Sequence, residues 1–382
     1  MSQRPRSKSW YVVDPDVFPD LTPCPLFPHS PQQSEKGQDW LARHRIQTEN
    51  RDRFVKALQQ RGVETKVVNR YEYNSEVIEW ADVIFTAGGD GTFLMASAKI
   101  SDRNKPIIGL NSDPTRSVGH LCIPSKFTND FERALDKLLA GDFKWKYRQR
   151  IRVTIEGDQE WDEPLEIHNQ NLGIVREFRY LDLDSDESRS RTNSTSDSTA
   201  GKSHNSKKRL LPVRALNEVF VGESLSSKVS NCELEIDGHP AFKIKCSGIT
   251  ICTGTGSTSW SFNINKLTTP CVTSLVKIVN EETGSKIPAD ATVIQRITQK
   301  FNDSLIFDPA KLRMAYTIRD PIVFRTGFDG NPRGFADKIR IRSKMFDACV
   351  VLDGGLSYKF NDGAIASFEI REEDALKTIE LQ

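Results

Sequence analysis

Three glycines and one carboxylate occupy the junction between a strand-like and a helix-like segment of this chain. Residues 80–86 are short, apolar and rich in β-branched side chains, and residues 93–100 are mostly helix formers. Between them lies Gly88-Gly89-Asp90-Gly91-Thr92. Glycines at such a place let backbone N–H groups approach an anion, and a helix N-terminus adds partial positive charge. The junction therefore predicts a phosphate-binding turn in an α/β domain.

The carboxylate is the unusual member of this motif. A negative charge beside phosphate oxygens is repelled, but it is well suited to accept a proton from an attacking hydroxyl. We therefore predict that Asp90 is a catalytic base and that Gly88, Gly89, Gly91 and Thr92 face the phosphates of a bound ligand. An ordinary tight turn of Gly and Asp is the alternative. The glycine spacing does not fit G-x-G-x-x-G, which argues against a dinucleotide bound for hydride transfer.

A second group of polar residues lies in the later half of the chain. Asn217-Glu218 places an amide and a carboxylate at the start of a predicted strand. The run Thr253–Trp260 follows an apolar strand and alternates glycine with small hydroxyl residues, which offer hydrogen bonds to a polar ligand. Trp260 adds a stacking face. The alternatives are polar capping of a strand end for the first motif and a flexible loop for the second.

The order of predicted elements indicates two domains, for which 382 residues suffice. Residues 1–37 read as an irregular segment in which 10–13 are the only strand candidate. Residues 38–143 alternate β and α, as in an open parallel sheet, and 144–355 read as a β-rich domain. Residues 182–209 are almost free of apolar side chains and predict a disordered insertion. Residues 356–382 form a C-terminal segment.

Charge and cysteine content exclude several partner classes. Lys and Arg number 53 against 52 Asp and Glu, so no bulk positive field indicates nucleic acid. No apolar run approaches the roughly 18 residues that span a bilayer, which predicts no membrane partner. Seven cysteines without a C-x-x-C pair suit a reducing compartment and predict no metal-ligand set. The basic first nine residues fit either a transit peptide or a disordered tail.

In this order and spacing, residues 88–92, 217–218 and 253–260 resemble the three motifs of NAD kinases. The wider phrasing of 111–122, 216–227, 351–355 and 360–367 resembles the mitochondrial branch of that family in animals, and the likeness runs from about residue 40 to the C-terminus. It implies an α+β two-domain fold, with an N-terminal α/β open-sheet domain, a β-sandwich-like second domain and an active site in the cleft between them. It also implies transfer of the γ-phosphoryl of ATP, with Mg²⁺, to the 2′-hydroxyl of the adenosine ribose of NAD, making NADP.

The resemblance also implies residue roles. Asp90 would be the base, Asn217 and Glu218 would hold ribose hydroxyls, and His120 takes the place of a substrate-contacting Phe. The full set of NAD-binding positions that it implies is Asn111, His120, Asn217, Glu218, Ser247, Thr255, Gly256, Ser257, Thr258, Ser259 and Trp260. Three positions depart from the family pattern, namely Gly254 for Pro, Trp260 for Tyr and Ser247 for Asp. Loss of the acid at Ser247 predicts weaker discrimination against NADH.

Two other classes compete with an NAD kinase. A lipid kinase of the diacylglycerol or sphingosine type carries a similar glycine motif, but Asn217-Glu218 and the lack of a membrane-docking stretch disfavour it. A nucleotide-binding regulator without catalysis gains nothing from a carboxylate at Asp90. The resemblance further implies a homodimer and a mitochondrial location, with the cytoplasm as the alternative.

Overall fold

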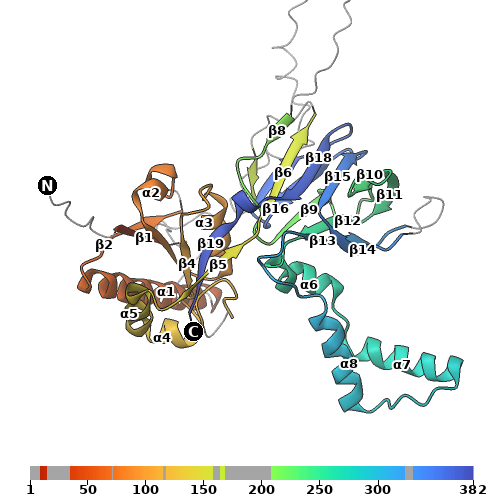
Figure 1. The fold of residues 1–382 in the computed structure, drawn as a ribbon, viewed down its shortest axis with the longest axis horizontal. Coiled ribbons are helices and arrows are strands. Elements are labelled where there is room, and N and C mark those ends of the chain that lie inside the picture. The colour runs from red at the N-terminus through yellow and green to blue at the C-terminus, as the bar shows by residue number, and fades with distance from the viewer. Residues whose placement is uncertain are drawn as a thin grey trace, which may run out of the picture. The chain divides into compact units, whose positions relative to one another are not determined.

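The computed structural model describes residues 9–14, 35–70, 72–114, 118–157, 164–167, 208–322 and 330–381. The chain separates into two compact units, residues 1–148 with 373–382, and residues 149–372. We describe each unit by itself (Figure 1).

The first unit is built on a parallel sheet of four strands in the order β2-β1-β3-β4. All three strand pairs are parallel. The strands are β1 (Ser9–Asp14), β2 (Glu64–Asn69), β3 (Val83–Ala87) and β4 (Ile107–Leu110). The predicted strand at 10–13 is confirmed as β1, a central strand of this sheet. Every described position of β4 is buried, as expected of a parallel strand covered on both faces.

Helices cover both faces of this sheet (Figure 1). They are α1 (Glu35–Gln60), α2 (Ser75–Trp80), α3 (Asp90–Ala98), α4 (Ser125–Asn129) and α5 (Phe131–Ala140). The aromatic rings of Phe54 on α1, Phe85 on β3 and Phe131 on α5 meet in the core beneath α1 and α5. Gly62, with φ +71°, supplies the left-handed turn after α1. The α/β prediction for this part of the chain is thus confirmed.

A two-stranded antiparallel sheet joins the chain's end to the first unit. It pairs β5 (Lys144–Arg148) with β19 (Leu376–Glu380). The expected division at residue 143 therefore differs from the structure, in which β5 belongs to the first unit. The expected separate segment 356–382 is also divided, since 373–382 join the first unit and the preceding residues stay in the second. Pairing between strands far apart in sequence is what moves both boundaries.

The second unit is a sandwich of two mainly antiparallel sheets. One has the order β11-β10-β15-β18-β6-β8 and the other β14-β13-β12-β9-β16-β17-β7. The first comprises β6 (Ile151–Glu156), β8 (Lys208–Leu210), β10 (Ser230–Ile236), β11 (Phe242–Cys246), β15 (Lys338–Ser343) and β18 (Ile365–Ile370). The second comprises β7 (Leu165–Glu166), β9 (Glu218–Glu223), β12 (Gly248–Cys252), β13 (Met314–Arg319), β14 (Arg333–Ala336), β16 (Ala348–Leu352) and β17 (Leu356–Lys359).

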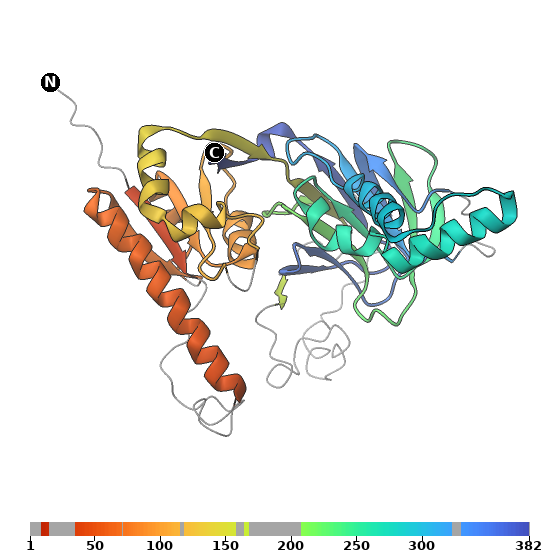
Figure 2. The same ribbon diagram turned by 90° about the horizontal axis from the view of Figure 1, so that it is seen from below.

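One apolar core joins these two sheets. Alternate residues of β6 and β15, such as Val153 and Ile341, meet Val219, Ile251 and Val350 of the other sheet. The β-rich prediction is thus confirmed. Three helices are added on one side, α6 (Trp260–Asn265), α7 (Thr269–Thr283) and α8 (Ala291–Asp303). The last two form a hairpin that stands off from the sheets in Figure 1 and lies in front of them, toward the viewer, in Figure 2.

The structure describes only parts of two further predicted segments, 1–37 and 182–209. The irregular segment 1–37 already contains β1 and the start of α1, and its residues 15–34 lie outside the described ones. The predicted insertion 182–209 also lies outside them, apart from Lys208 and Arg209, which belong to β8. Among the described helices, none is long and apolar enough to cross a bilayer.

Candidate functional site

The first group of candidate residues surrounds the junction between β3 and α3. Gly88 closes the strand by donating its N–H to Leu110 O (2.9 Å). A Cβ at Gly88 would lie 2.2 Å from the Thr92 hydroxyl, so only glycine fits there. A Cβ at Gly91, in the first turn of α3, would meet nothing within 4 Å. The open space at Gly91 and the unused N–H groups of a helix start suit an anion.

Asp90 is the first residue of α3, and each of its carboxylate oxygens accepts one backbone hydrogen bond. His120 N donates to Oδ2 (3.0 Å) and Leu121 N donates to Oδ1 (2.8 Å). Asp90 therefore ties the start of α3 to the turn at 119–121, a role that sequence reasoning did not anticipate. Each carboxylate oxygen has a second lone pair, so the group can still accept a proton.

The turn that Asp90 holds contains one predicted NAD-binding residue, His120, and packs against another, Asn111. Gly119 has φ +64°, and a Cβ there would lie 2.7 Å from the Asn111 amide nitrogen. Asn111 is buried, and its Oδ1 accepts a hydrogen bond from Asp113 N (3.1 Å). The Asn111 side chain thus supports the loop from within. His120, in contrast, is exposed and its backbone lies directly against Asp90.

Two neighbours of Asp90 were not found from the sequence. Cys122 donates its thiol to Gly88 O (3.7 Å), and burial, with Asp90 as a second cause, raises the pKa of this thiol to about 12. Cys122 is therefore a neutral packing residue at pH 7. Arg148, at the end of β5, interacts electrostatically with Asp90, although burial lowers the pKa of its guanidinium. It lies 58 residues from Asp90 (148 − 90), and no local pattern marks it.

The second group lies in the other unit, where β9 begins. Asn217 is buried, and its amide nitrogen donates to Ser259 Oγ (3.2 Å). Its Oδ1, and Oε2 of the half-buried Glu218, are enclosed and have no hydrogen-bond partner among the described residues. Burial raises the pKa of Glu218 to about 8, and the negative charge of Asp353 contributes further. Enclosed oxygens without donors are costly unless a ligand supplies the missing partners.

Asp353 holds the backbone of this second group. It follows β16 with φ +49°, and its carboxylate accepts from Leu216 N (2.7 Å), Asn217 N (2.8 Å) and Glu218 N (3.1 Å). Sequence reasoning used Asp353 to support the family resemblance but assigned it no role. An Asp-Gly pair is a common turn signal, so only the tertiary contacts distinguish this one.

The Thr253–Trp260 loop packs tightly against the start of β9. A Cβ at Gly256 would lie 2.1 Å from Asn217 O, and one at Gly254 would lie 2.2 Å from Asp308 O. The second contact leaves no room for a side chain at position 254 of this chain. The Ser257 hydroxyl donates to Gly254 O (2.6 Å) and that of Thr258 to Thr255 O (3.1 Å). These two hydroxyls hold the loop together and keep acceptor lone pairs, so their predicted contact with NAD stays a prediction.

Trp260 remains half-exposed at the end of this loop. Its ring lies 5.7 Å from that of Phe220, and the Arg319 guanidinium lies 5.5 Å from its ring centre. Ser247 precedes β12, five residues before Cys252 at the strand's other end, and its N–H donates to Arg319 O (2.8 Å). The departure from Asp to Ser therefore lies beside a cation that already occupies one side of Trp260.

No group of three or more His, Cys, Asp or Glu side chains within the described part of the chain could hold a metal ion. Mg²⁺ is commonly bound by one or two carboxylates together with substrate phosphates, so such a cluster is not needed for a metal that arrives with ATP. The six cysteines that the structure describes are free of disulfides.

Comparison with known proteins bears directly on this geometry. The ATP-NAD kinase N-terminal domain matches residues 31–143, which include the Asp90 loop. The human protein named NAD kinase 2, mitochondrial, is 42% identical over 342 residues, covering 90% of this chain and 75% of the human protein. The Xenopus tropicalis protein of the same name is 42% identical over 355 residues, covering 89% of this chain and 80% of its own. The chain belongs to the NAD kinase family.

Solved structures of this family share the fold. An NAD kinase from Archaeoglobus fulgidus in complex with ATP superposes with a TM-score of 0.50 at 18% identity, covering 98% of this chain and 93% of its own. A yeast NADH kinase complexed with NADH superposes with a TM-score of 0.58 at 11% identity, covering 98% and 84%. Membership of the NAD kinase family favours an NAD kinase over the lipid kinase considered above, which none of these similarities supports.

Proposed function

We propose that the protein phosphorylates NAD with ATP, using Asp90 as the base. The 2′-hydroxyl of the adenosine ribose attacks the γ-phosphorus, the bond from that phosphorus to the bridging oxygen breaks, and ADP leaves. The hydroxyl proton passes to a free lone pair of Asp90, whose other lone pairs are engaged by His120 N and Leu121 N. Held in this way, the carboxylate needs no reorganisation before it accepts the proton.

The substrate's ribose is held by the second group. The observation that carries the proposal is the pair of enclosed oxygens, Asn217 Oδ1 and Glu218 Oε2, without a hydrogen-bond partner among the described residues. A ribose hydroxyl can donate to the amide oxygen of Asn217, and because a hydroxyl both donates and accepts, a second one can pair with Glu218 in either protonation state. Ser259 and Trp260 line the nucleoside pocket beside them, while Gly256 and Ser257 keep the loop against Asn217.

The test is incubation of the purified protein with ATP, Mg²⁺ and either NAD or diacylglycerol. We expect phosphorylation of NAD alone, with the new phosphate on the 2′ position by NMR of the product. Asn217→Ala should raise the KM for NAD with little change for ATP. Asn280→Ala is the matched control, because Asn280 hydrogen-bonds Ile287 at the far end of the helical hairpin. Equal effects of the two variants would contradict the ribose role.

Mg²⁺ enters this proposal as part of the nucleotide substrate. When bound, it neutralises charge on the β- and γ-phosphates of ATP. The N–H groups at the start of α3, next to Gly91, donate hydrogen bonds to the phosphate oxygens. Omission of Mg²⁺ should abolish NADP formation while leaving the Tm of the protein without nucleotide unchanged.

We also propose a mitochondrial location and a homodimer. The close relatives carry "mitochondrial" in their names, which supports the first and is tested by imaging a tagged full-length protein. The dimer follows from the family resemblance, and the exposed Leu275 and Ile278 on α7 offer apolar surface for it. Sedimentation velocity decides the second, since a single monomeric species at micromolar concentration would contradict it.

A further inference from the structure

Asp353 is the most completely engaged side chain of the second group. Its carboxyl group is enclosed, and the three N–H groups that it accepts belong to consecutive residues, Leu216, Asn217 and Glu218. The backbone closes the other side of the contact, because Asp353 N donates to Glu218 O (3.0 Å). A single side chain thus fixes the conformation of the segment that carries both enclosed acceptors.

A buried cation accompanies this carboxylate. Arg150 is fully buried, and its positive charge favours the ionised form of Asp353. The pairing of Ile151 with Ala215 through two backbone hydrogen bonds brings the start of β6 beside the start of β9. Charge compensation and three donors therefore make Asp353 the acid that ionises.

Glu218 lies in the opposite situation. Its Oε2 has no donor among the described residues, and the nearby Asp353 charge opposes a second ionisation. The other titratable neighbour is Cys252, paired with Glu218 on β12, and burial raises the pKa of its thiol to about 12. Since this thiol stays neutral, nothing but Asp353 and Arg150 among these groups carries charge at pH 7. Asp353 has a cation and three donors beside it and Glu218 has neither, so the first negative charge of this neighbouring pair lies on Asp353.

We propose that Asp353 is a positioning residue for the reaction, which orients Asn217 and Glu218 as one unit and keeps Glu218 in its neutral form. Neutral Glu218 donates its O–H to a ribose oxygen, while Asn217 Oδ1 accepts from a ribose hydroxyl. A neutral group adds no charge beside an anionic dinucleotide. This inference rests on the proposed function, because it concerns how the same substrate is held.

The pKa values give the order of ionisation. Burial raises the pKa of Asp353 to about 6, against the opposing effect of its N–H donors and Arg150, while that of Glu218 rises to about 8. Between these values Asp353 is charged and Glu218 is protonated. The kcat/KM for NAD should therefore fall as the pH rises through the pKa of Glu218, whereas the KM for ATP should not follow it.

The experiment compares pH profiles of kcat/KM for NAD from pH 6 to 9.5. In Asp353→Asn the like charge is absent, so the fall should move to lower pH by about one unit. In Glu218→Gln the fall assigned to Glu218 should disappear. Asp237→Asn is the matched control, because Asp237 also has φ +49°, precedes a glycine and accepts two backbone N–H groups through Oδ1, yet lies between β10 and β11. Its profile should equal that of the wild type.

The outcomes separate this inference from the proposed function. If the wild type forms no NADP, the proposed function fails. If the wild type is active but the profile of Glu218→Gln keeps the fall, Glu218 does not act in its neutral form and the inference is overturned. If Asp353→Asn folds but its profile is not shifted, Asp353 does not influence the ionisation of Glu218 and the inference is overturned; if it does not fold, the Glu218→Gln profile still decides whether Glu218 acts in its neutral form. A shift in Asp237→Asn equal to that in Asp353→Asn would also overturn it.

Discussion

Replacement of Asp90 by asparagine should lower both the catalytic rate and the stability of the protein, and the two effects can be measured separately. The carboxylate accepts one backbone N–H on each oxygen, at 3.0 and 2.8 Å. Asparagine has one acceptor oxygen, so its NH₂ group would face one of these donors. Loss of one charge-assisted hydrogen bond costs about 1.5–3 kcal/mol. Loss of a charge at the helix N-terminus adds about 0.3–1 kcal/mol.

These terms total about 2–4 kcal/mol, and for a unit of this size each kcal/mol lowers Tm by about 2–4 °C. We therefore expect Tm of Asp90→Asn to fall by roughly 5–15 °C. Independently, kcat should fall about 10²–10⁴-fold, because the proton acceptor is gone. Both quantities are measurable on one preparation, with kcat taken at a temperature well below either Tm.

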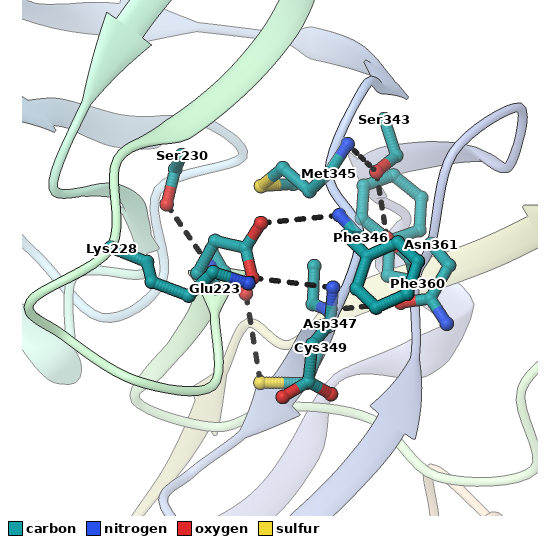
Figure 3. Close-up of polar contacts among 12 residues, drawn as sticks. Glu223, Lys228, Ser230, Ser343, Met345, Phe346, Asp347, Cys349, Phe360 and Asn361 are labelled. Atoms are coloured by element: carbon teal, nitrogen blue, oxygen red, sulfur yellow. Dashed lines mark hydrogen bonds and ion pairs between the residues drawn. The ribbon is translucent and has the colours of Figure 1, made fainter. Parts of the chain in front are cut away.

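Glu223→Gln provides the matched control for stability. Glu223 also accepts one backbone N–H on each oxygen, from Phe346 (3.1 Å) and Asp347 (3.2 Å), beside Lys228 (Figure 3). It ends β9, about 17 Å along the strand from Glu218. This variant should lose stability but keep kcat. If Asp90→Asn retains more than about a tenth of wild-type kcat, the assignment of Asp90 as base is wrong.

Three further predictions follow from the same contacts. Glu218→Gln removes an acid whose pKa rises from 4.5 to about 8 on folding, so the stability of the wild type falls as the pH rises through this range. The difference in Tm, variant minus wild type, should therefore increase between pH 5 and 9. A constant difference would contradict this prediction. Gly91→Ala should leave Tm equal or higher but raise the KM for ATP, because the added methyl takes space left for phosphate, whereas Gly256→Ala should lower Tm through its clash with Asn217; the reverse order would refute both. Ser247→Asp should raise the ratio of kcat/KM for NAD to kcat/KM for NADH, because a negative charge favours the cationic nicotinamide. The corresponding free energy should be less than the ~4 kcal/mol of one charge pair at 4 Å, since Arg319 is adjacent to Ser247. An unchanged ratio would mean that residue 247 does not face the nicotinamide.

The alternation of elements and the main motifs were predictable from local patterns. A buried apolar run followed by Gly-Gly-Asp-Gly-Thr is a local signal, and β3, its turn and α3 form at those residues. The succession of strand-like segments after residue 143 likewise predicts a β-rich domain, and the sandwich was implied by the family resemblance. Domain boundaries were less predictable, since β5 and β19 pair across more than two hundred residues.

The roles of individual site residues depended on tertiary contacts. Hydroxyls in Thr253–Trp260 suggested ligand contacts from composition, but the Ser257 hydroxyl is satisfied within the loop. The requirement for Gly256 arises from the approach of Asn217, a residue of a different segment. Such contacts leave no local pattern, because the partner lies tens of residues away.

Residue identity and short spacing were enough to indicate the family, the order of β and α elements, and the chemical types available at the two motifs. Which of the two neighbouring acids ionises first depends on contacts that form only in the folded chain. In the sequence, Asp353 is an acid before a glycine and Glu218 is an acid at a strand start, and neither pattern indicates a charge state. Three N–H donors and Arg150 lie around Asp353, whereas no donor among the described residues reaches Oε2 of Glu218. Charge state in a protein depends on enclosure and neighbouring charge, and both are properties of the folded chain.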